Sequence, residues 1–311
     1  MSAQAVLFDA PGPKARARHR ILGVVGGLVL VGLLVLVVRG LASPGNNQFT
    51  AQKWTPFLDP ETWTSYLLPG LLATLQAAGA AVVLSGVFGV LLGLGRLSEA
   101  KAVRVVCGAL VEFLRSVPVL VMMLFVYYFC IFVLGVLGDT STFVGVVGGL
   151  TLYNSAVIAE LIRSGVFSLP RGQREAGLAI GLTPRQTLLT VLLPQAVTAM
   201  LPSLISQLVV ILKDTALGYI ISFTELLRSG TTLSTAYGNL IPTLIVVAAM
   251  FIALNYTLSL VARVVERRLQ QARRTSAPVA AAGGPGEPGA GGPGAVGVGA
   301  VGPVGGEGTT R

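Results

Sequence analysis

Charged residues are scarce in this sequence of 311 residues. Asp, Glu, Lys and Arg make up only 11% of it, whereas 53% of the residues are hydrophobic. Soluble domains carry about a quarter charged residues, so the composition excludes an ordinary soluble domain. Long apolar runs without β-strand alternation cross a bilayer as helices, and the sequence therefore predicts an all-α membrane protein.

Histidine and cysteine are almost absent. The chain has one histidine, His19, and two cysteines, Cys107 and Cys130, which both lie in apolar surroundings. These residues supply neither a metal-ligand set nor a nucleophile with its base, so we expect no metal site, no bound cofactor and no enzymatic activity. The P-loop pattern G-x-x-x-x-G-K-[ST] is also missing, which predicts that any ATP binds to another chain.

Six apolar runs are long enough to cross a membrane, which requires about 20 residues. They are Ile21–Val38, Leu68–Leu94, Val117–Leu137, Phe143–Ile162, Val191–Leu212 and Leu240–Val261. We interpret the first run as a retained anchor, although the small residues of "RGLASPG" after it also fit a cleaved secretory signal.

The distribution of basic residues predicts the orientation. The net charge is +9, and Lys and Arg cluster before the first run and after the second, fourth and sixth runs. Cytoplasmic loops carry such an excess, so the pattern places both termini in the cytoplasm of a multi-pass protein and argues against nucleic-acid binding. Residues 275–311 are mostly Gly, Pro and Ala, a composition that predicts a disordered tail.

The loop between the fourth and fifth runs has the signals of a helical hairpin. Pro170 can begin a helix and Gly181 can end it in a left-handed conformation. Thr183 is then an N-cap, followed by Pro184 at the first position of a second helix. A short hairpin of this kind, with the small residues Ala176 and Gly177, is suited to docking into another protein.

Three E-x-x-R pairs occur, and a spacing of three places each pair on one helix face. Each could be a neutralising ion pair near a membrane boundary, or could present charge to a zwitterionic substrate. The pairs are Glu112 with Arg115, Glu160 with Arg163 and Glu225 with Arg228.

Other polar residues lie within the apolar runs. Asn154, Ser155 and Gln207 fit hydrogen bonds between helices or contacts with a substrate. Lys213, Asp214 and Thr215 at the end of the fifth run fit an interfacial anchor or a gating contact. Glycine pairs that allow close helix approach occur at Gly23/Gly27, Gly89/Gly93 and Gly145/Gly149.

The hairpin resembles the "EAA" loop of permease subunits of ATP-binding-cassette importers. Glu175-Ala176-Gly177, then Gly181 and Leu193-Pro194, follow that pattern, with Gly177 in place of the usual second Ala. The segments "VEFLRSVPVLV", "NSAVIAELIRSGV" and "LPQAVTAMLPSLISQLVVILKDTAL" are similar to the polar amino-acid branch of these permeases. The N-terminal "LFDAPGPKARARHR" further resembles glutamate-type permeases of high-GC Gram-positive bacteria.

The resemblance implies a type I permease subunit in the bacterial plasma membrane that imports a polar amino acid of the glutamate, glutamine or aspartate type. It implies coupling to an ATPase dimer, which binds ATP and Mg²⁺, through Arg174, Glu175, Ala176, Gly177, Gly181 and Arg185. The other implied partners are a second permease subunit, identical or not, an external binding protein and membrane lipid.

These expectations divide the chain into five parts. They are a basic cytoplasmic N-terminus at 1–20, an anchor at 21–38, an external loop at 39–66, a permease domain of five helices at 67–267 with the coupling loop at 170–196, and the tail at 275–311. An ion-coupled transporter is the alternative, but the inverted repeats typical of many such proteins are not evident.

Overall fold

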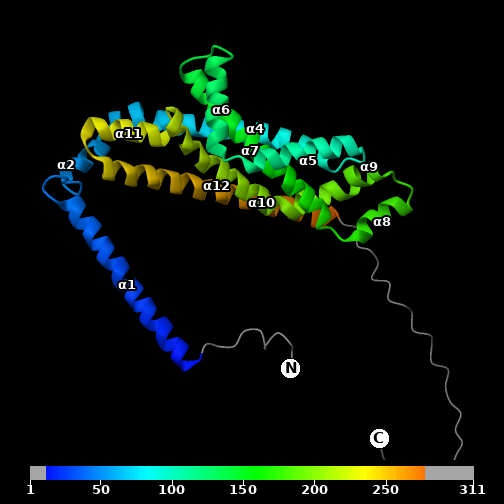
Figure 1. Ribbon diagram of the computed structural model, residues 1–311, viewed down its shortest axis with the longest axis horizontal. Helices are drawn as coiled ribbons and strands as arrows, with labels where there is room; N and C mark the ends of the chain where they lie inside the picture. Colours follow the sequence, from blue (N-terminus) through cyan, green and yellow to red (C-terminus); the bar gives the residue numbers. More distant parts are fainter. Residues whose placement is uncertain (1–11, 277–311) are drawn as a thin grey trace, which may run out of the picture. The chain divides into compact units, whose positions relative to one another are not determined.

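The computed structural model describes residues 12–276, and every regular element in that part of the chain is helical (Figure 1). The predicted tail lies outside the described residues, apart from its first two. The α-helices are α1 (Pro13–Ala42), α2 (Ala51–Trp54), α3 (Pro60–Thr62), α4 (Leu68–Arg96), α5 (Lys101–Ser116), α6 (Val119–Phe132), α7 (Asp139–Phe167), α8 (Arg171–Ala179), α9 (Pro184–Gln186), α10 (Leu193–Asp214), α11 (Leu226–Tyr237) and α12 (Leu240–Ser276). The 3₁₀-helices η2 (Thr55–Leu58) and η5 (Thr215–Ile221) and the π-helical turns η3 (Trp63–Leu67) and η4 (Thr187–Leu192) connect them.

Within residues 12–276, five helical segments are long and apolar enough to cross a membrane, and α5 with α6 forms a sixth candidate that bends by 101°. The predicted third span, Val117–Leu137, therefore had the wrong bounds, because α6 ends at Phe132 and α5 precedes it. Val117 is extended, with φ −91° and ψ 130°, since proline disfavours the helical conformation of the residue before it, here Pro118.

Helix α7 packs between α4 and α6 at very short range. A Cβ atom added to Gly89 of α4 would lie 2.7 Å from Cβ of Ile158 on α7. On the other side of α7, a Cβ atom added to Gly149 would lie 2.6 Å from the backbone nitrogen of Met123 on α6. The glycine pairs at 89/93 and 145/149 therefore do mediate the predicted close helix contacts.

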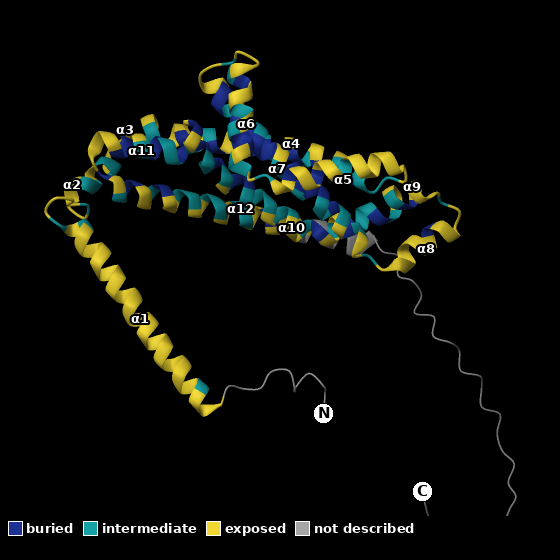
Figure 2. Cartoon of the chain, viewed as in Figure 1, coloured by how far each residue is buried: buried dark blue, intermediate teal, exposed yellow. Residues whose placement is uncertain are grey.

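Helix α1 differs from the others in its burial. None of its residues is buried, and Figure 2 shows the helix in the colour of exposed residues almost throughout. Gly23 and Gly27 have open space around them, so they mediate no contact with another of the described helices. The exposed Leu and Val side chains of α1 suit a hydrocarbon environment, as expected for an anchor.

The N-terminus of α11 is capped by a fully buried carboxylate. Glu225 accepts hydrogen bonds from the backbone N–H groups of Leu227 and Arg228 at 2.7 and 2.8 Å. The hydroxyl of Thr74 on α4 accepts a third bond, from the N–H of Leu226 at 3.1 Å. These acceptors satisfy three of the amides that lack a partner at a helix start. Burial raises the pKa of the Glu225 carboxyl to about 7, although the two N–H groups lower it.

We predict that Gly149→Ala destabilises the bundle by about 1–3 kcal/mol, because its new methyl group would meet the backbone of α6, which cannot move without disturbing the helix. The matched control is Gly86→Ala on α4, where the added methyl group meets nothing within 4 Å. Thermal unfolding in detergent measures both variants. Equal melting temperatures for the two variants would contradict the close contact.

The buried Glu225 also predicts a pH dependence. The folded protein holds this proton up to about pH 7, whereas the unfolded chain releases it near pH 4.5. The folded state therefore binds more protons between these values, and the stability that Glu225 contributes falls as the pH rises from 4.5 to 7. In Glu225→Gln the melting temperature should fall less between pH 5 and pH 8 than in the wild type. Glu99→Gln, which removes an exposed carboxylate, is the control.

Candidate functional site

The loop between α7 and α10 is a helix–turn–helix, as its sequence predicts. Pro170 stands at the N-cap of α8, and Gly181 adopts φ +87° in the turn. The side chains of Thr183 and Gln186 form a reciprocal capping box around Pro184 at the start of α9. We refer to residues 170–192 as the hairpin.

The two arms of the hairpin touch at a glycine. Gly177 is the only buried residue of α8, and a Cβ atom added there would lie 2.6 Å from Cγ2 of Thr187. A second contact joins the hairpin to α10, because Nε2 of Gln195 donates a hydrogen bond to Oε1 of Gln173 at 3.1 Å. The small residue predicted at position 177 therefore holds the hairpin's arms together rather than facing outward.

The hairpin is largely exposed, and its charged side chains have few partners within the described part of the chain. Arg174, Glu175, Ala176 and Arg185 are all exposed, and the ion pairs of the described residues include none of the three charged ones. Two apolar side chains share this exposure, since Leu178 is 39% and Ile180 is 78% accessible. Leu178 lines the cleft described below, whereas Ile180 does not. An exposed apolar side chain on a hairpin outside the apolar runs indicates a surface for another protein.

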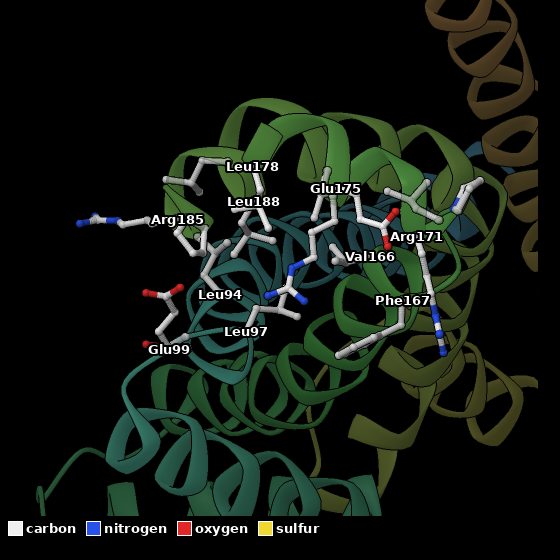
Figure 3. Close-up of a pocket in the computed structure, with 18 of the residues that line it drawn as sticks. Leu94, Leu97, Glu99, Val166, Phe167, Arg171, Glu175, Leu178, Arg185 and Leu188 are labelled. Atoms are coloured by element: carbon white, nitrogen blue, oxygen red, sulfur yellow. The ribbon is translucent and has the colours of Figure 1, made fainter. Parts of the chain in front are cut away.

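A cleft of about 1090 Å³ separates the hairpin from the ends of α4 and α7. Figure 3 shows Leu94 from α4, Leu97 directly after its end and Leu188 from the hairpin along the walls of the cleft, while Arg185 extends away from it. Most of the lining residues are apolar, and Glu99, Arg171 and Arg174 also line the cleft. The chain connects the hairpin to α7 at one end and to α10 at the other.

Five charged side chains from α4, α5 and α7 form an ion cluster. Glu160 is at its centre: Arg96 donates to it at 2.7 Å and Arg163 at 2.6 Å, while Arg115 lies 4.0 Å away. Arg96 also donates to Glu112 at 3.0 Å. The Arg96 side chain is only 12% exposed and that of Glu160 is 21% exposed, so the cluster is partly withdrawn from water.

The E-x-x-R spacing is realised as an ion pair in only one of three cases. Glu160 and Arg163 pair as the spacing predicts. Glu112 pairs with Arg96 of another helix and not with Arg115. Glu225 caps α11, and its partner in the pattern, Arg228, instead lies 5.4 Å from the ring centre of Tyr219. No local pattern indicated that Arg96 would pair with Glu160, 64 positions away.

The other polar residues predicted within the spans lie at two places outside the ion cluster. Gln207 of α10 donates from Nε2 to Oδ1 of the buried Asn154 on α7, which is one of the expected hydrogen bonds between helices. The hydroxyl of Ser155 bonds within α7, to the carbonyl of Thr151. The pair of Asn154 and Gln207 joins α7 to α10 at positions inside both helices.

Lys213, Asp214 and Thr215 lie at the end of α10. Lys213 is exposed, Asp214 is half-buried and Thr215 is buried. Thr215 donates its hydroxyl to the carbonyl of Leu212. Within residues 12–276, no ion pair connects Lys213 or Asp214 to the ion cluster. The predicted pathway residues therefore fall into three groups: those of the ion cluster, those around Asn154, and those at the end of α10.

The ion cluster predicts unequal effects of its two carboxylates. Glu160→Gln leaves Arg96 largely buried without its central anion, so the variant should lose about 3 kcal/mol of stability. Glu112→Gln removes a 60% exposed carboxylate and should cost no more than about 1 kcal/mol. Unfolding of both variants in mixed detergent micelles measures the difference. Equal losses would show that Glu160 is not the centre of the cluster.

Residues 85–271 match the family described as binding-protein-dependent transport system inner membrane component. The chain is 48% identical to the glutamate transport system permease protein GluD of Corynebacterium glutamicum. The 229 aligned residues cover 74% of this chain and 84% of that protein. It is 34% identical over 207 residues to the probable glutamine ABC transporter permease protein GlnP of Bacillus subtilis, covering 66% of this chain and 94% of that protein.

Solved structures agree with the sequence relatives. The fold matches a crystal structure of an amino acid ABC transporter with histidines at a TM-score of 0.61 and 29% identity, over 66% of this chain and 95% of that one. The methionine ABC transporter MetNI, at 22% identity and a TM-score of 0.55, shares the fold. With six candidate spans and the hairpin in place, the chain belongs to the family of binding-protein-dependent transport system inner membrane components, the ABC permease subunits.

Proposed function

We propose that this chain is the permease subunit of an ATP-driven importer of polar amino acids, with glutamate as the first candidate substrate. The names of the relatives support this substrate class, since the 48% identical protein is a glutamate permease and others are glutamine or glutamate/aspartate permeases. The binding protein that delivers the substrate, and the ATPase that supplies the energy, are separate chains in this proposal.

The hairpin is the part that an ATPase subunit would hold. The observation that carries this assignment is the exposure of the hairpin. Glu175 and Leu178 are exposed at the cleft, and Ile180, which does not line the cleft, is 78% accessible. An ATPase groove would bury these apolar side chains and give Glu175 a partner. The rigid turn at Gly181 and the tight contact of Gly177 with Thr187 keep the two arms together when a force acts on them.

The attachment of the hairpin to two spans supplies the mechanism. It follows α7 after two residues and ends with η4, which leads without a break into α10. Movement of the hairpin by closing ATPases therefore shifts the inner ends of α7 and α10, and this shift opens the pathway alternately to the two sides. A ligand can drive such a change only through contacts that differ between the two states, which the ATPase groove would provide.

The other partners complete the importer. Two ATPases bind ATP with Mg²⁺, and this chain binds neither. A second permease subunit forms the pathway together with this one, and an external binding protein docks on the face opposite the hairpin. The multi-pass chain lies in the bacterial plasma membrane with both termini in the cytoplasm, as its basic residues indicate.

Within the pathway we assign different roles to the three groups of polar residues. Asn154, Ser155 and Gln207 lie where α7 meets α10 and are candidates for substrate contact. Lys213, Asp214 and Thr215 are candidates for a gate at the outer end of α10. Glu112, Arg115, Glu160 and Arg163 satisfy one another with Arg96, so their first role is to hold α4, α5 and α7 together.

We expect Glu175→Lys to lose the co-purifying ATPase and at least about 90% of ATP-dependent glutamate uptake, because the reversed charge would be buried in the docking groove. Glu99→Lys is the matched control: it makes the same charge change on the opposite rim of the same cleft, outside the hairpin. The measurements are affinity purification of the complex and uptake of labelled glutamate into proteoliposomes with the binding protein.

Competition by unlabelled glutamine, aspartate and arginine in the same assay tests the substrate. If Glu175→Lys retains the ATPase and transports normally, the hairpin assignment is wrong. If the wild-type complex imports no amino acid, the proposed substrate class is wrong.

A further inference from the structure

The outer end of the bundle carries an arginine without a carboxylate partner. Arg228 lies on α11, and the ion pairs of the described residues do not include it. Its guanidinium stacks over the ring of Tyr219, with Cζ 5.4 Å from the ring centre. Both residues line a shallow pocket of about 480 Å³ that also contains Thr231, Thr232 and Thr235.

The position of α11 places this pocket on the side opposite the hairpin. Gly70, near the start of α4, packs against Ser229 of α11, whereas Leu94, near the end of α4, lines the hairpin cleft. A helix rises 1.5 Å per residue, so roughly 36 Å of α4 separates the two positions, which is enough to cross the hydrocarbon core. In Figure 1 α11 and α8 accordingly lie near opposite ends of α4.

The two faces of α11 have different characters. Its buried face holds Leu226, Gly230 and Leu233, and Gly230 packs against Val247 of α12. The other face carries Arg228 and threonines three, four and seven residues later, a spacing that puts all four side chains on one side of the helix. A face with an arginine and three hydroxyls is unsuited to hydrocarbon, so it faces water or a polar ligand.

The hydrogen bonds of the threonines leave their oxygens available as acceptors. Thr231 and Thr232 both donate to the carbonyl of Arg228, and Thr235 donates to that of Thr231. A hydroxyl whose proton is used can still accept from an ammonium group. The pocket thus presents a fixed cation at one end and hydroxyl acceptors along the next turns of the helix.

We infer that Arg228, Tyr219 and the threonine face of α11 form an entry site that binds the carboxylate of the amino-acid substrate as it leaves the binding protein. The guanidinium offers paired N–H donors to a carboxylate, and the tyrosine ring fixes its plane without competing for those donors. The threonine oxygens accept the substrate's ammonium group. This inference rests on the proposed import function.

The test uses the complete complex in proteoliposomes with its ATPase and binding protein. In Arg228→Gln, transport of glutamate should fall at least about tenfold, while the ATP hydrolysis stimulated by the loaded binding protein should stay within about twofold of wild type. The matched control, Arg39→Gln, removes an exposed arginine at the C-terminal end of α1 and should transport normally.

The comparison of substrates identifies the carboxylate. A loss for glutamate but not for glutamine assigns Arg228 to the side-chain carboxylate, whereas an equal loss for both assigns it to the α-carboxylate, and either result supports the site. Loss of transport together with loss of stimulated ATP hydrolysis overturns it, since Arg228 would then contact the binding protein. Normal transport in Arg228→Gln also overturns it.

A rescue experiment separates the charge from any effect on folding. Arg228→Cys is purified, and a membrane-impermeant cationic thiol reagent is then added to the assembled complex. Restored glutamate transport with the cationic reagent but not with an anionic one supports the site, and equal results with both reagents overturn it. Treated wild-type complex controls for Cys107 and Cys130.

The results also separate the entry site from the proposed function. A wild-type complex that imports no amino acid would overturn the proposed function itself. Normal transport by both the wild type and Arg228→Gln would overturn only the entry site.

Discussion

Contact at backbone distance between α7 and its neighbours α4 and α6 is the constraint on which the other features depend. Lipid tails are as apolar as leucine, so helices in a membrane associate through close packing and hydrogen bonds. Glycines on α4 and α7 permit that packing, and a side chain at Gly149 would meet the backbone of α6. Only with α4 this near to α7 can Arg96 reach Glu160 at 2.7 Å. The same packing gives the hairpin a firm base at the end of α7.

The ion cluster specifies which helices meet. Three arginines and two glutamates leave one positive charge near the ends of α4 and α7 that border the hairpin cleft. Withdrawing these groups from water is costly, and their mutual attraction repays it only in good geometry. A helix rotated by one residue would leave Arg96 or Glu160 without a partner, so the cluster penalises alternative packings more than it adds stability.

Local signals made the hairpin and most of the spans predictable. The caps at Thr183 and the turn at Gly181 involve residues within a few positions of each other, and the apolar runs are continuous. The bend at Pro118 was not predicted, because it divides an apolar run that is continuous in the sequence. The capping role of Glu225 was not predicted either, because it depends on α4 lying beside α11. The spacing of glycines was also insufficient to predict close helix contacts. Gly23 and Gly27 have the same spacing as Gly89 and Gly93 but contact no helix within the described residues.

The helices that join the two ends of the molecule differ in stiffness, and this difference directs any movement that starts at the hairpin. Helix α4 has proline only at its start and α7 has none, and the two pack tightly along their length. Helix α10 begins after a π-helical turn and contains Pro202, which removes one hydrogen bond from its ladder. Bending is therefore easiest in α10, between the hairpin and Gln207. The contact of Asn154 on α7 with Gln207 on α10 is then the place where a displaced hairpin first changes the polar interior, while α4, which packs against α11, holds α11 and its pocket in position.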